Sequence, residues 1–292
     1  MPQFSAVHTR WMIASGAALI GLFALSSPAA PDELPKAGTS FTDCAGCPEM
    51  VVVPPGSFTM GAQANEDGHL EDEEPTHPVT IAKPFAVSRL EITLGQFTAF
   101  VEATGHKTGS SCWIWIGTLY KFAEGKSFRD PGYQQGNDYP VACVSWHDAQ
   151  AYAAWLSTKT NQSYRLLTEA EWEFAARAGT ASAFFTGDAA ITKKQAHFDA
   201  DGAVEVGKYD ANGFGLKDMH GNVWEWVQDC YLDSYKNTPP DGSAVPDFDK
   251  CRRVNRGGGW GDYPKYLRSA SRRWDNPASW YSVVGFRLAR NL

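Results

Sequence analysis

Glycine and tryptophan residues in the second half of the chain constrain its fold more than any other feature. They concentrate in three segments, residues 213–226 (GFGLKDMHGNVWEW), 253–260 (RVNRGGGW) and 285–290 (GFRLAR). Glycine permits turns and close backbone approaches that other residues resist, and a buried Trp needs a hydrogen-bond partner for its indole nitrogen. With 27 Gly and 11 Trp, the chain is predicted to form a compact, loop-rich core rather than a helical bundle.

Helix signals are confined to the earlier part of the chain. Thr93 can cap a helix over residues 94–103, and Ser145 can open a second helix. Thr168 starts a capping-box pattern, which predicts a third helix that ends at Gly179. Beyond Thr180 the chain consists mostly of turn residues and short apolar runs. Helices early in a turn-rich β chain predict an α+β fold.

The N-terminus has the pattern of a secretory leader. His8 and Arg10 precede an apolar run over residues 11–25, and a small-x-small pattern ends at Ala29. This order is typical of a cleaved signal peptide. An uncleaved membrane anchor is the alternative, but the run is shorter than the ~20 residues that span the hydrocarbon layer.

The expected organisation is a signal peptide over residues 1–29, a flexible tail over 30–43 and one domain over 44–292. We therefore predict an exported protein, periplasmic or extracellular, with no stable membrane span after cleavage. The formal net charge is −7. An acidic balance argues against nucleic acid or an anionic membrane surface as a partner.

The cysteine count predicts disulfides. An even number of cysteines in an exported protein favours pairing, although about fifteen pairings are compatible with six residues. The Cys44-x-x-Cys47 spacing is also compatible with a redox or zinc half-motif. The six cysteines are Cys44, Cys47, Cys112, Cys143, Cys230 and Cys251.

Several segments together resemble the formylglycine-generating enzyme (sulfatase-modifying factor) family. They are the three glycine- and tryptophan-rich segments and residues 140–146 (PVACVSW) and 165–173 (RLLTEAEWE). The resemblance runs from about Cys44 to the C-terminus. It implies a variant of the C-type-lectin-like fold with little regular secondary structure. It also implies the disulfides Cys44–Cys47, Cys112–Cys143 and Cys230–Cys251.

The resemblance implies a structural calcium ion at the turn before the Trp-Glu-Trp sequence. By position, Asp218 and Glu225 would supply carboxylate oxygens, and Gly221 and Val223 would supply backbone carbonyls. Hard oxygen ligands of this kind suit calcium. The alternative is a capped turn, in which the two carboxylates accept hydrogen bonds from backbone amides.

The same resemblance argues against the family's copper chemistry. In the oxidase branch two cysteines hold copper, and their positions here carry Asp262 and Leu267; a serine of the same motif is replaced by Gly259. Copper(I) prefers thiolates, and neither a carboxylate nor a leucine substitutes for one. The remaining cysteines suit structural bridges.

Three further metal sites are weaker candidates. Asp199 and Asp201 stand near the family's second calcium position. Iron is an alternative at Asp262, if a two-histidine, one-carboxylate arrangement forms. A cluster with metal-like composition occurs in the acidic loop over residues 66–74 and just after it, although runs of like charge are usually solvated. The iron candidates are His147, His197 and His220, and the acidic cluster comprises His69, Glu71, Asp72, Glu73 and His77.

Aromatic and basic residues near the C-terminus suggest a ligand groove, which in the family takes an extended peptide. Aromatic and arginine side chains are preferred binding anchors, although they also fill cores. A peptide, a glycan or a small molecule is the expected ligand. The groove candidates are Trp260, Asp262, Tyr266, Arg268 and Arg273.

The resemblance is compatible with two functions. The first is an exported oxidoreductase that matures a protein or a secondary metabolite without the thiolate site; some family members oxidise a siderophore fluorophore during export. The second is a non-catalytic protein that binds a peptide or glycan, or assembles the envelope, on the same fold. Because a fold does not determine an activity, residue patterns leave both open.

Overall fold

The computed structural model describes residues 1–6 and 36–292. The chain divides into two units, Met1–Leu34 and Pro35–Leu292, and every described helix and strand belongs to the second. The predicted apolar leader and its cleavage site lie outside the described residues. Within the described part, no helix is both long and apolar enough to cross a membrane.

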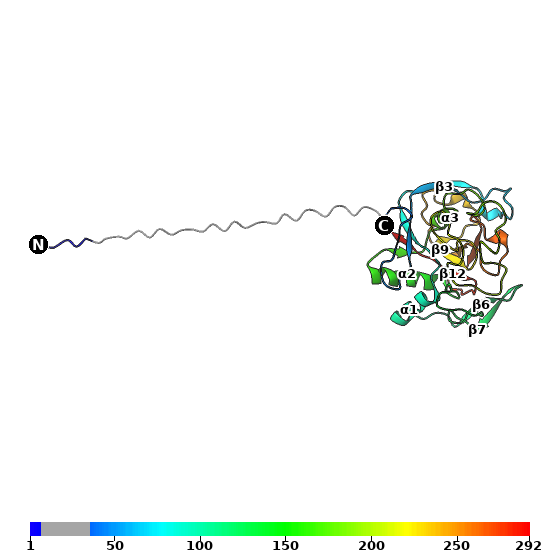
Figure 1. Cartoon of the computed structure of the whole chain (residues 1–292), viewed down its shortest axis with the longest axis horizontal. Helices are drawn as coiled ribbons and strands as arrows, with labels where there is room; N and C mark the ends of the chain where they lie inside the picture. Colours follow the sequence, from blue (N-terminus) through cyan, green and yellow to red (C-terminus); the bar gives the residue numbers. More distant parts are fainter. Residues whose placement is uncertain (7–35) are drawn as a thin grey trace. The chain divides into compact units, whose positions relative to one another are not determined.

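A five-stranded antiparallel sheet joins the two ends of the domain (Figure 1). Its central strand β5 is flanked by β2 on one side and by the C-terminal strand β13 on the other. All four residues of β2 are buried, so this apolar strand forms part of the core. In spatial order the strands are β1 (Ser40–Phe41), β2 (Met50–Val53), β5 (Phe85–Ser88), β13 (Ala289–Asn291) and β8 (Tyr164–Arg165).

A four-stranded sheet gathers the three glycine- and tryptophan-rich segments. Strand β9 pairs antiparallel with β10 and parallel with β12, so the Trp-Glu-Trp sequence lies beside the segment that begins Gly285-Phe286-Arg287. The pairing explains why motifs far apart in sequence form one unit. In spatial order the strands are β11 (Arg272–Asp275), β10 (Arg253–Arg256), β9 (Trp224–Cys230) and β12 (Val284–Phe286).

Two separate hairpins and three short 3₁₀ turns complete the strand-rich part. The second hairpin, β6–β7, lies at the lower right of Figure 1. The hairpins are β3 (Gly56–Met60) with β4 (His77–Ile81), and β6 (Ser111–Trp115) with β7 (Tyr120–Glu124). The 3₁₀ turns are η1 (Glu71–Glu73), η2 (Tyr235–Asn237) and η3 (Pro264–Tyr266).

The three predicted helices are present, and the α+β prediction is confirmed. They are α1 (Leu94–Thr104), α2 (Trp146–Thr160) and α3 (Glu169–Arg177). Thr93, Ser145 and Thr168 each accept a hydrogen bond from the backbone three residues later, in complete capping boxes. The predicted end of α3 at Gly179 was wrong by one residue, because Ala178 already adopts the left-handed conformation, with φ 46°.

Buried tryptophans have the partners that the composition requires. The indole nitrogens of Trp226 and Trp260 donate to the carbonyl oxygens of Val144 (3.0 Å) and Ser282 (3.2 Å). Both rings are almost fully buried and belong to a cluster that includes residues of α1, α2 and β12. These bonds remove the cost of burying a polar indole N–H.

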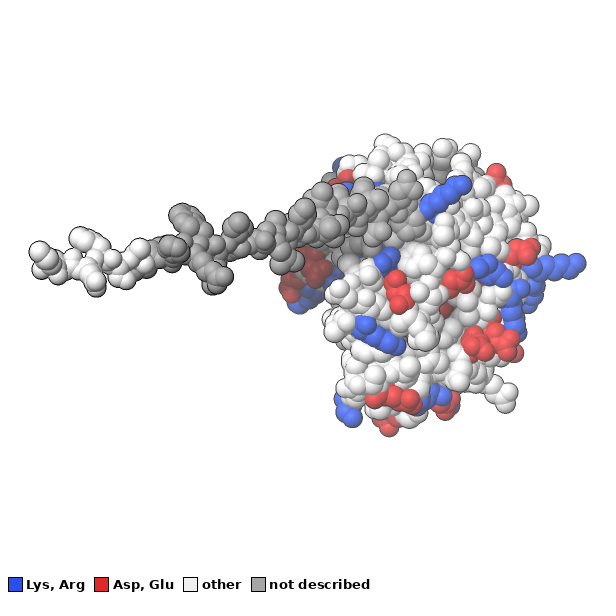
Figure 2. Space-filling model, turned by 60° about the vertical axis from the view of Figure 1, so that its left-hand side comes forward, with Lys and Arg blue, Asp and Glu red and all other residues white. Residues whose placement is uncertain are grey.

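All six cysteines form the three disulfides that the resemblance implied, Cys44–Cys47, Cys112–Cys143 and Cys230–Cys251. No cysteine is free. On the face shown in Figure 2, basic and acidic side chains are interspersed rather than gathered into a patch of one sign.

Candidate functional site

An open cavity of about 530 Å³ lies beside the four-stranded sheet. Strand β11 supplies one wall, and the start of β9, the segment after the glycine-rich run and the acidic loop supply the others. Its lining residues are Leu70, Asp72, Trp224, Asp262, Tyr266, Arg272, Arg273, Trp274, Asp275 and Tyr281.

Asp262 is held in this cavity by two hydrogen bonds. Its Oδ2 accepts from the indole nitrogen of Trp224 (2.6 Å) and from the backbone amide of Gly259 (2.9 Å). The preceding turn requires glycine, because Gly258 has φ +76° and a Cβ there would lie 2.8 Å from a methyl carbon of Leu267. Burial raises the pKa of Asp262, and the two hydrogen bonds partly oppose that rise.

Arg273 and Asp275, on the same face of β11, form the second polar group. The guanidinium of Arg273 donates to the hydroxyl of Tyr120 (2.7 Å) and to Oδ1 of Asp275 (3.1 Å). Burial raises the pKa of Asp275, while Arg273 and the nearby hydroxyl of Tyr281 lower it. Because Tyr120 begins β7, the hairpin contributes directly to the polar arrangement of the cavity.

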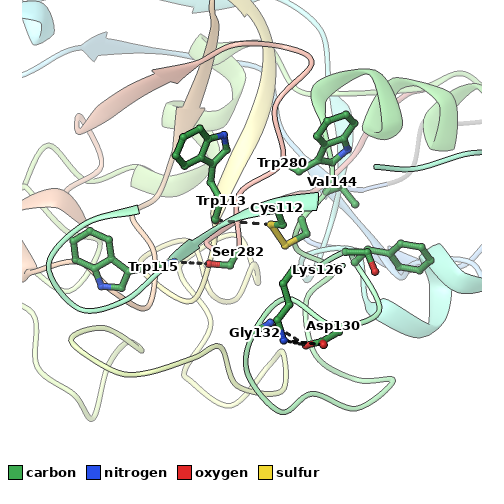
Figure 3. Close-up of a disulfide and its surroundings, with 12 residues drawn as sticks. Cys112, Trp113, Trp115, Lys126, Asp130, Gly132, Val144, Trp280 and Ser282 are labelled. Carbon is green, nitrogen blue, oxygen red and sulfur yellow. Dashed lines mark hydrogen bonds and ion pairs between the residues drawn. A yellow bond between two sulfur atoms is a disulfide. The ribbon is translucent and has the colours of Figure 1, made fainter. Parts of the chain in front are cut away.

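The β6–β7 hairpin is fastened to the chain beside the cavity (Figure 3). The backbone amide of Trp115 donates to the hydroxyl of Ser282 (3.1 Å), as Figure 3 shows. The backbone amide of Trp113 donates to the carbonyl of Trp280 (2.8 Å). Cys112, next to them on β6, is tied to the loop before α2 by its disulfide. This anchoring sets the position of the hairpin relative to β11.

The structure places only some of the predicted groove residues in the cavity. Asp262, Tyr266 and Arg273 line it. Trp260 is buried in the core, with 2% of its surface exposed. Arg268 is also buried and is directed away from this cavity, because it donates to both carboxylate oxygens of Glu73 at 2.6 and 2.7 Å. For these two residues the groove prediction was wrong.

The interpretation of the acidic loop as solvated was also wrong in part. Glu73 is fully buried against Arg268, and Glu66 binds the same guanidinium at 2.7 Å. Asp72 lines the cavity and accepts a hydrogen bond from the hydroxyl of Tyr231 (2.7 Å). Like charges in this loop are tolerated because buried arginines from distant segments compensate them.

Sequence reasoning missed several cavity residues. Leu70 and Asp72 belong to a loop that composition alone assigns to solvent. Tyr120 does not line the cavity but accepts a hydrogen bond from Arg273, which does, and it lies on a hairpin with no site motif. For Trp224 and Asp275, the sequence did contain a pattern that could have identified them. The first belongs to the Trp-Glu-Trp motif, and the second follows Arg273 by two residues, which places both on one face of a strand.

The predicted calcium-binding turn lies beside a positively charged side chain of the protein itself, Arg287. Arg287 donates to both oxygens of Glu225 at 2.7 Å, and Trp172 adds a third bond to Oε2 at 2.7 Å. Glu225 therefore does not fit as a calcium ligand in this arrangement. Asp218 fits better, because only its Oδ2 has a partner among the described residues, the amide of Gly207.

At this turn, buried carboxyl groups outnumber the buried cationic groups that face them. Glu91 is buried and its Oε1 has no hydrogen-bond partner among the described residues. Burial raises the pKa of Glu91, and the charges of Asp218 and Glu225 raise it further. With Arg287 as the buried counter-charge, three carboxyl groups share one guanidinium. Such an excess favours either protonation or a bound cation.

The histidines predicted for iron are not brought together with Asp262. His220 lies between the carbonyl of Leu267 (2.7 Å) and the amide of Phe185 (3.3 Å), and burial lowers its pKa to about 4. His197 contacts the carbonyl of Gly202 (2.8 Å), and His147 packs on Trp146.

In the described part of the chain, no group of three or more His, Cys, Asp or Glu side chains is arranged so that it could hold a metal ion. The weaker calcium candidate Asp199 instead pairs with Lys193 at 3.1 Å, and Asp201 is exposed. Leu267, at one of the family's copper positions, is fully buried. Among the described residues, no free thiol lines the cavity and none of the three predicted histidines contacts Asp262.

The fold is that of the formylglycine-generating enzyme-like proteins. The model of the sulfatase-modifying factor enzyme 1-like domain matches residues 36–292. The chain therefore belongs to this family. It is 31% identical over 289 residues to the formylglycine-generating enzyme of Streptomyces coelicolor, with 83% of this chain and 89% of that protein covered.

A solved structure, PvdO from Pseudomonas aeruginosa, is more similar in sequence. It shares 43% identity, with a TM-score of 0.81, over 89% of this chain and all of the other. The chain is also 32% identical to the serine/threonine-protein kinase pkn1 of Chlamydia pneumoniae, over 84% of this chain. It spans only 38% of that kinase's length, so the likeness concerns one part of the kinase.

Proposed function

We propose that this protein is an exported oxidoreductase that matures a protein or a secondary metabolite in the cavity around Asp262, without a thiolate metal site. One observation carries the proposal. At a position where the resemblance implies a copper-binding cysteine, a partly buried carboxylate is held by Trp224 and Gly259 at an aromatic cavity. All six cysteines are engaged in disulfides, which agrees with a route that uses no thiolate.

In the proposed step, Asp262 accepts a proton from the substrate. The substrate loses two hydrogen atoms and gains a double bond, and dioxygen takes up two electrons and two protons to become hydrogen peroxide. A general base works best when its pKa lies near the working pH, and burial moves the pKa of Asp262 in that direction. Arg273, with its charge near Asp262, favours the ionised form.

A deletion strain tests this function. We expect it to accumulate an exported compound that is two hydrogen atoms heavier than the normal product, detected by mass spectrometry of the culture fluid. The wild-type gene should restore the normal product. Asp262→Asn should leave most of the compound unoxidised, because removal of a general base costs about 10²–10⁴-fold in rate.

The matched control is Asp249→Asn, an exposed aspartate outside the cavity, which should restore the product fully. A chemically unchanged set of exported products in the deletion strain would contradict the proposal. It would instead favour the non-catalytic alternative, a peptide- or glycan-binding or envelope-assembly protein. The aromatic and arginine lining of the cavity suits that alternative as well, because such residues are common binding anchors.

We also propose that calcium binds at the turn around Asp218, with the carbonyls of Gly221 and Val223. Calcium at 100 times its dissociation constant would stabilise the fold by about 2.7 kcal/mol, a rise of roughly 5–10 °C in melting temperature for a domain of this size. Thermal unfolding in EDTA and in excess calcium measures this difference. Asp218→Asn should reduce the shift and Asp249→Asn should not; equal melting temperatures with and without calcium would contradict the site.

A further inference from the structure

Strand β3, at the top of the domain in Figure 1, has one edge that no other described strand covers. It pairs with β4 alone, and in that pair Pro78 lies opposite Thr59. Because proline has no N–H group, these two residues do not exchange hydrogen bonds across the ladder. The amide of Thr80, opposite Ser57, also points away from β3, since it donates to the carbonyl of Pro240 at 2.9 Å.

The backbone N–H and C=O groups of Ser57 and Thr59 therefore point away from β4, because both residues of such a pair direct these groups outwards. In the part of the chain that the structure describes, none of these groups has a hydrogen-bond partner. Both residues are exposed. Two residues at this spacing on an open strand edge present the donors and acceptors that an added strand pairs with.

A groove runs along this edge and continues beyond the end of β3. A cavity of about 320 Å³ is lined by Ser57, Thr59 and residues 179–181, which follow α3. A second cavity of about 460 Å³ shares Gln63 and Glu66 with the first. The two cavities therefore adjoin, and an extended chain that pairs with β3 would continue into the second cavity.

The second cavity carries more acidic than basic side chains. Asp67 and Asp188 line it and are exposed, and Glu66 lines it as well. Glu66 binds Arg268 through Oε1 at 2.7 Å, but that arginine is already matched by a buried glutamate. The other cation of the described lining is the exposed Lys265. Three carboxylates beside one uncompensated cation attract a positively charged side chain.

We propose that this groove binds an extended segment of a partner protein, which adds as a strand to the free edge of β3 and places a lysine or arginine side chain among Glu66, Asp67 and Asp188. Main-chain hydrogen bonds to Ser57 and Thr59 supply the affinity, and the basic side chain supplies the specificity. No described residue lines both this groove and the cavity beside β11. The groove is thus an interaction surface separate from the site of the proposed oxidation.

Fluorescence anisotropy with the labelled peptide acetyl-Lys-Ser-Gly-Thr-Val-Thr-Val-amide tests the proposal. An antiparallel strand on β3 has its N-terminal end near Glu66, so the probe carries its lysine there. We expect saturable binding to the folded protein, and at least about tenfold weaker binding when two adjacent residues of the probe are N-methylated, because backbone hydrogen bonds are then lost. Alanine in place of the lysine should weaken the probe about fivefold or more.

Variants of the protein test the two parts of the groove separately. Thr59→Pro removes an outward N–H that β4 does not use, and edge strands tolerate proline. It should weaken the probe about tenfold, whereas Thr59→Val, which keeps the N–H, should not. Asp67→Asn and Asp188→Asn should each weaken the lysine probe about two- to fivefold, the range for exposed ion pairs, and leave the alanine probe unchanged. Asp249→Asn should alter neither.

Three results would overturn the proposal. The first is no saturable binding of the lysine probe, and the second is equal affinity of the N-methylated probe, which would exclude strand addition. The third is a dimer, detected by light scattering, that Thr59→Pro converts to a monomer, because the free edge would then belong to a second copy of this chain. If Thr59→Pro lowers the melting temperature strongly, the N-methylated probes decide the question, since they leave the protein unchanged.

Discussion

Arg287→Met is expected to destabilise the protein by about 3–5 kcal/mol, the usual cost of leaving one partner of a buried ion pair uncompensated. Arg287 is fully buried, binds both oxygens of Glu225 and contacts the carbonyl of Lys217 at 3.0 Å. Its removal leaves Glu225 without a counter-charge among the neighbouring carboxyls Asp218 and Glu91. Urea or thermal unfolding measures the loss.

The pH dependence of this variant has a defined sign. Without Arg287, the pKa of the buried Glu91, which burial already raises, rises further because the charge of Arg287 no longer lowers it, so the folded protein binds that proton more tightly. The variant should therefore regain stability as the pH falls from 7 towards 5. The double variant Arg287→Met with Glu225→Gln should recover part of the loss at neutral pH, because a neutral amide needs no counter-ion.

Arg89→Met is the matched control. Its ion pair with Glu49 spans 3.1 Å, and both side chains are more than a third exposed, so a change below about 1 kcal/mol is expected. A similarly small effect for Arg287→Met would show that the buried pair does not hold the Trp-Glu-Trp strand to the C-terminal segment.

Removal of the Cys112–Cys143 disulfide is expected to have the second largest effect. The cysteines are 31 residues apart, and closing a loop of that length is worth about 3–4 kcal/mol on the chain-entropy estimate. The double variant Cys112→Ser, Cys143→Ser should lose about that much stability. It should also restore less of the normal product in the deletion strain, because the hairpin that carries Tyr120 to Arg273 is then held by hydrogen bonds alone.

Removal of Cys230–Cys251, with a separation of 21 residues, is the control. It should cost about as much stability by the same loop-entropy argument. Neither cysteine lies on the hairpin or lines the cavity, so the yield of normal product in the deletion strain should change little. Equal losses of normal product in the two double variants would show that general loosening of the fold, rather than the position of the hairpin, governs the cavity.

Local sequence determined where the three helices begin, because the capping hydrogen bonds span only three residues. Thr93, Ser145 and Thr168 start helices because their side chains bond the backbone amide three residues later, and no distant partner is needed. The family resemblance extended this to the fold class and the disulfide pairs, because several ordered motifs on one chain specify one architecture.

The contacts that distant segments make were decided by tertiary structure. Glu73 looked solvated in an acidic loop, yet the fold brings Arg268 against it across 195 positions of sequence; Tyr120 reaches Arg273 across 153 positions. Composition lists the charges but not their partners, since pairing depends on strand register and on which face a side chain occupies. Capping bonds are local, whereas buried ion pairs and cavity walls exist only after the sheets have assembled.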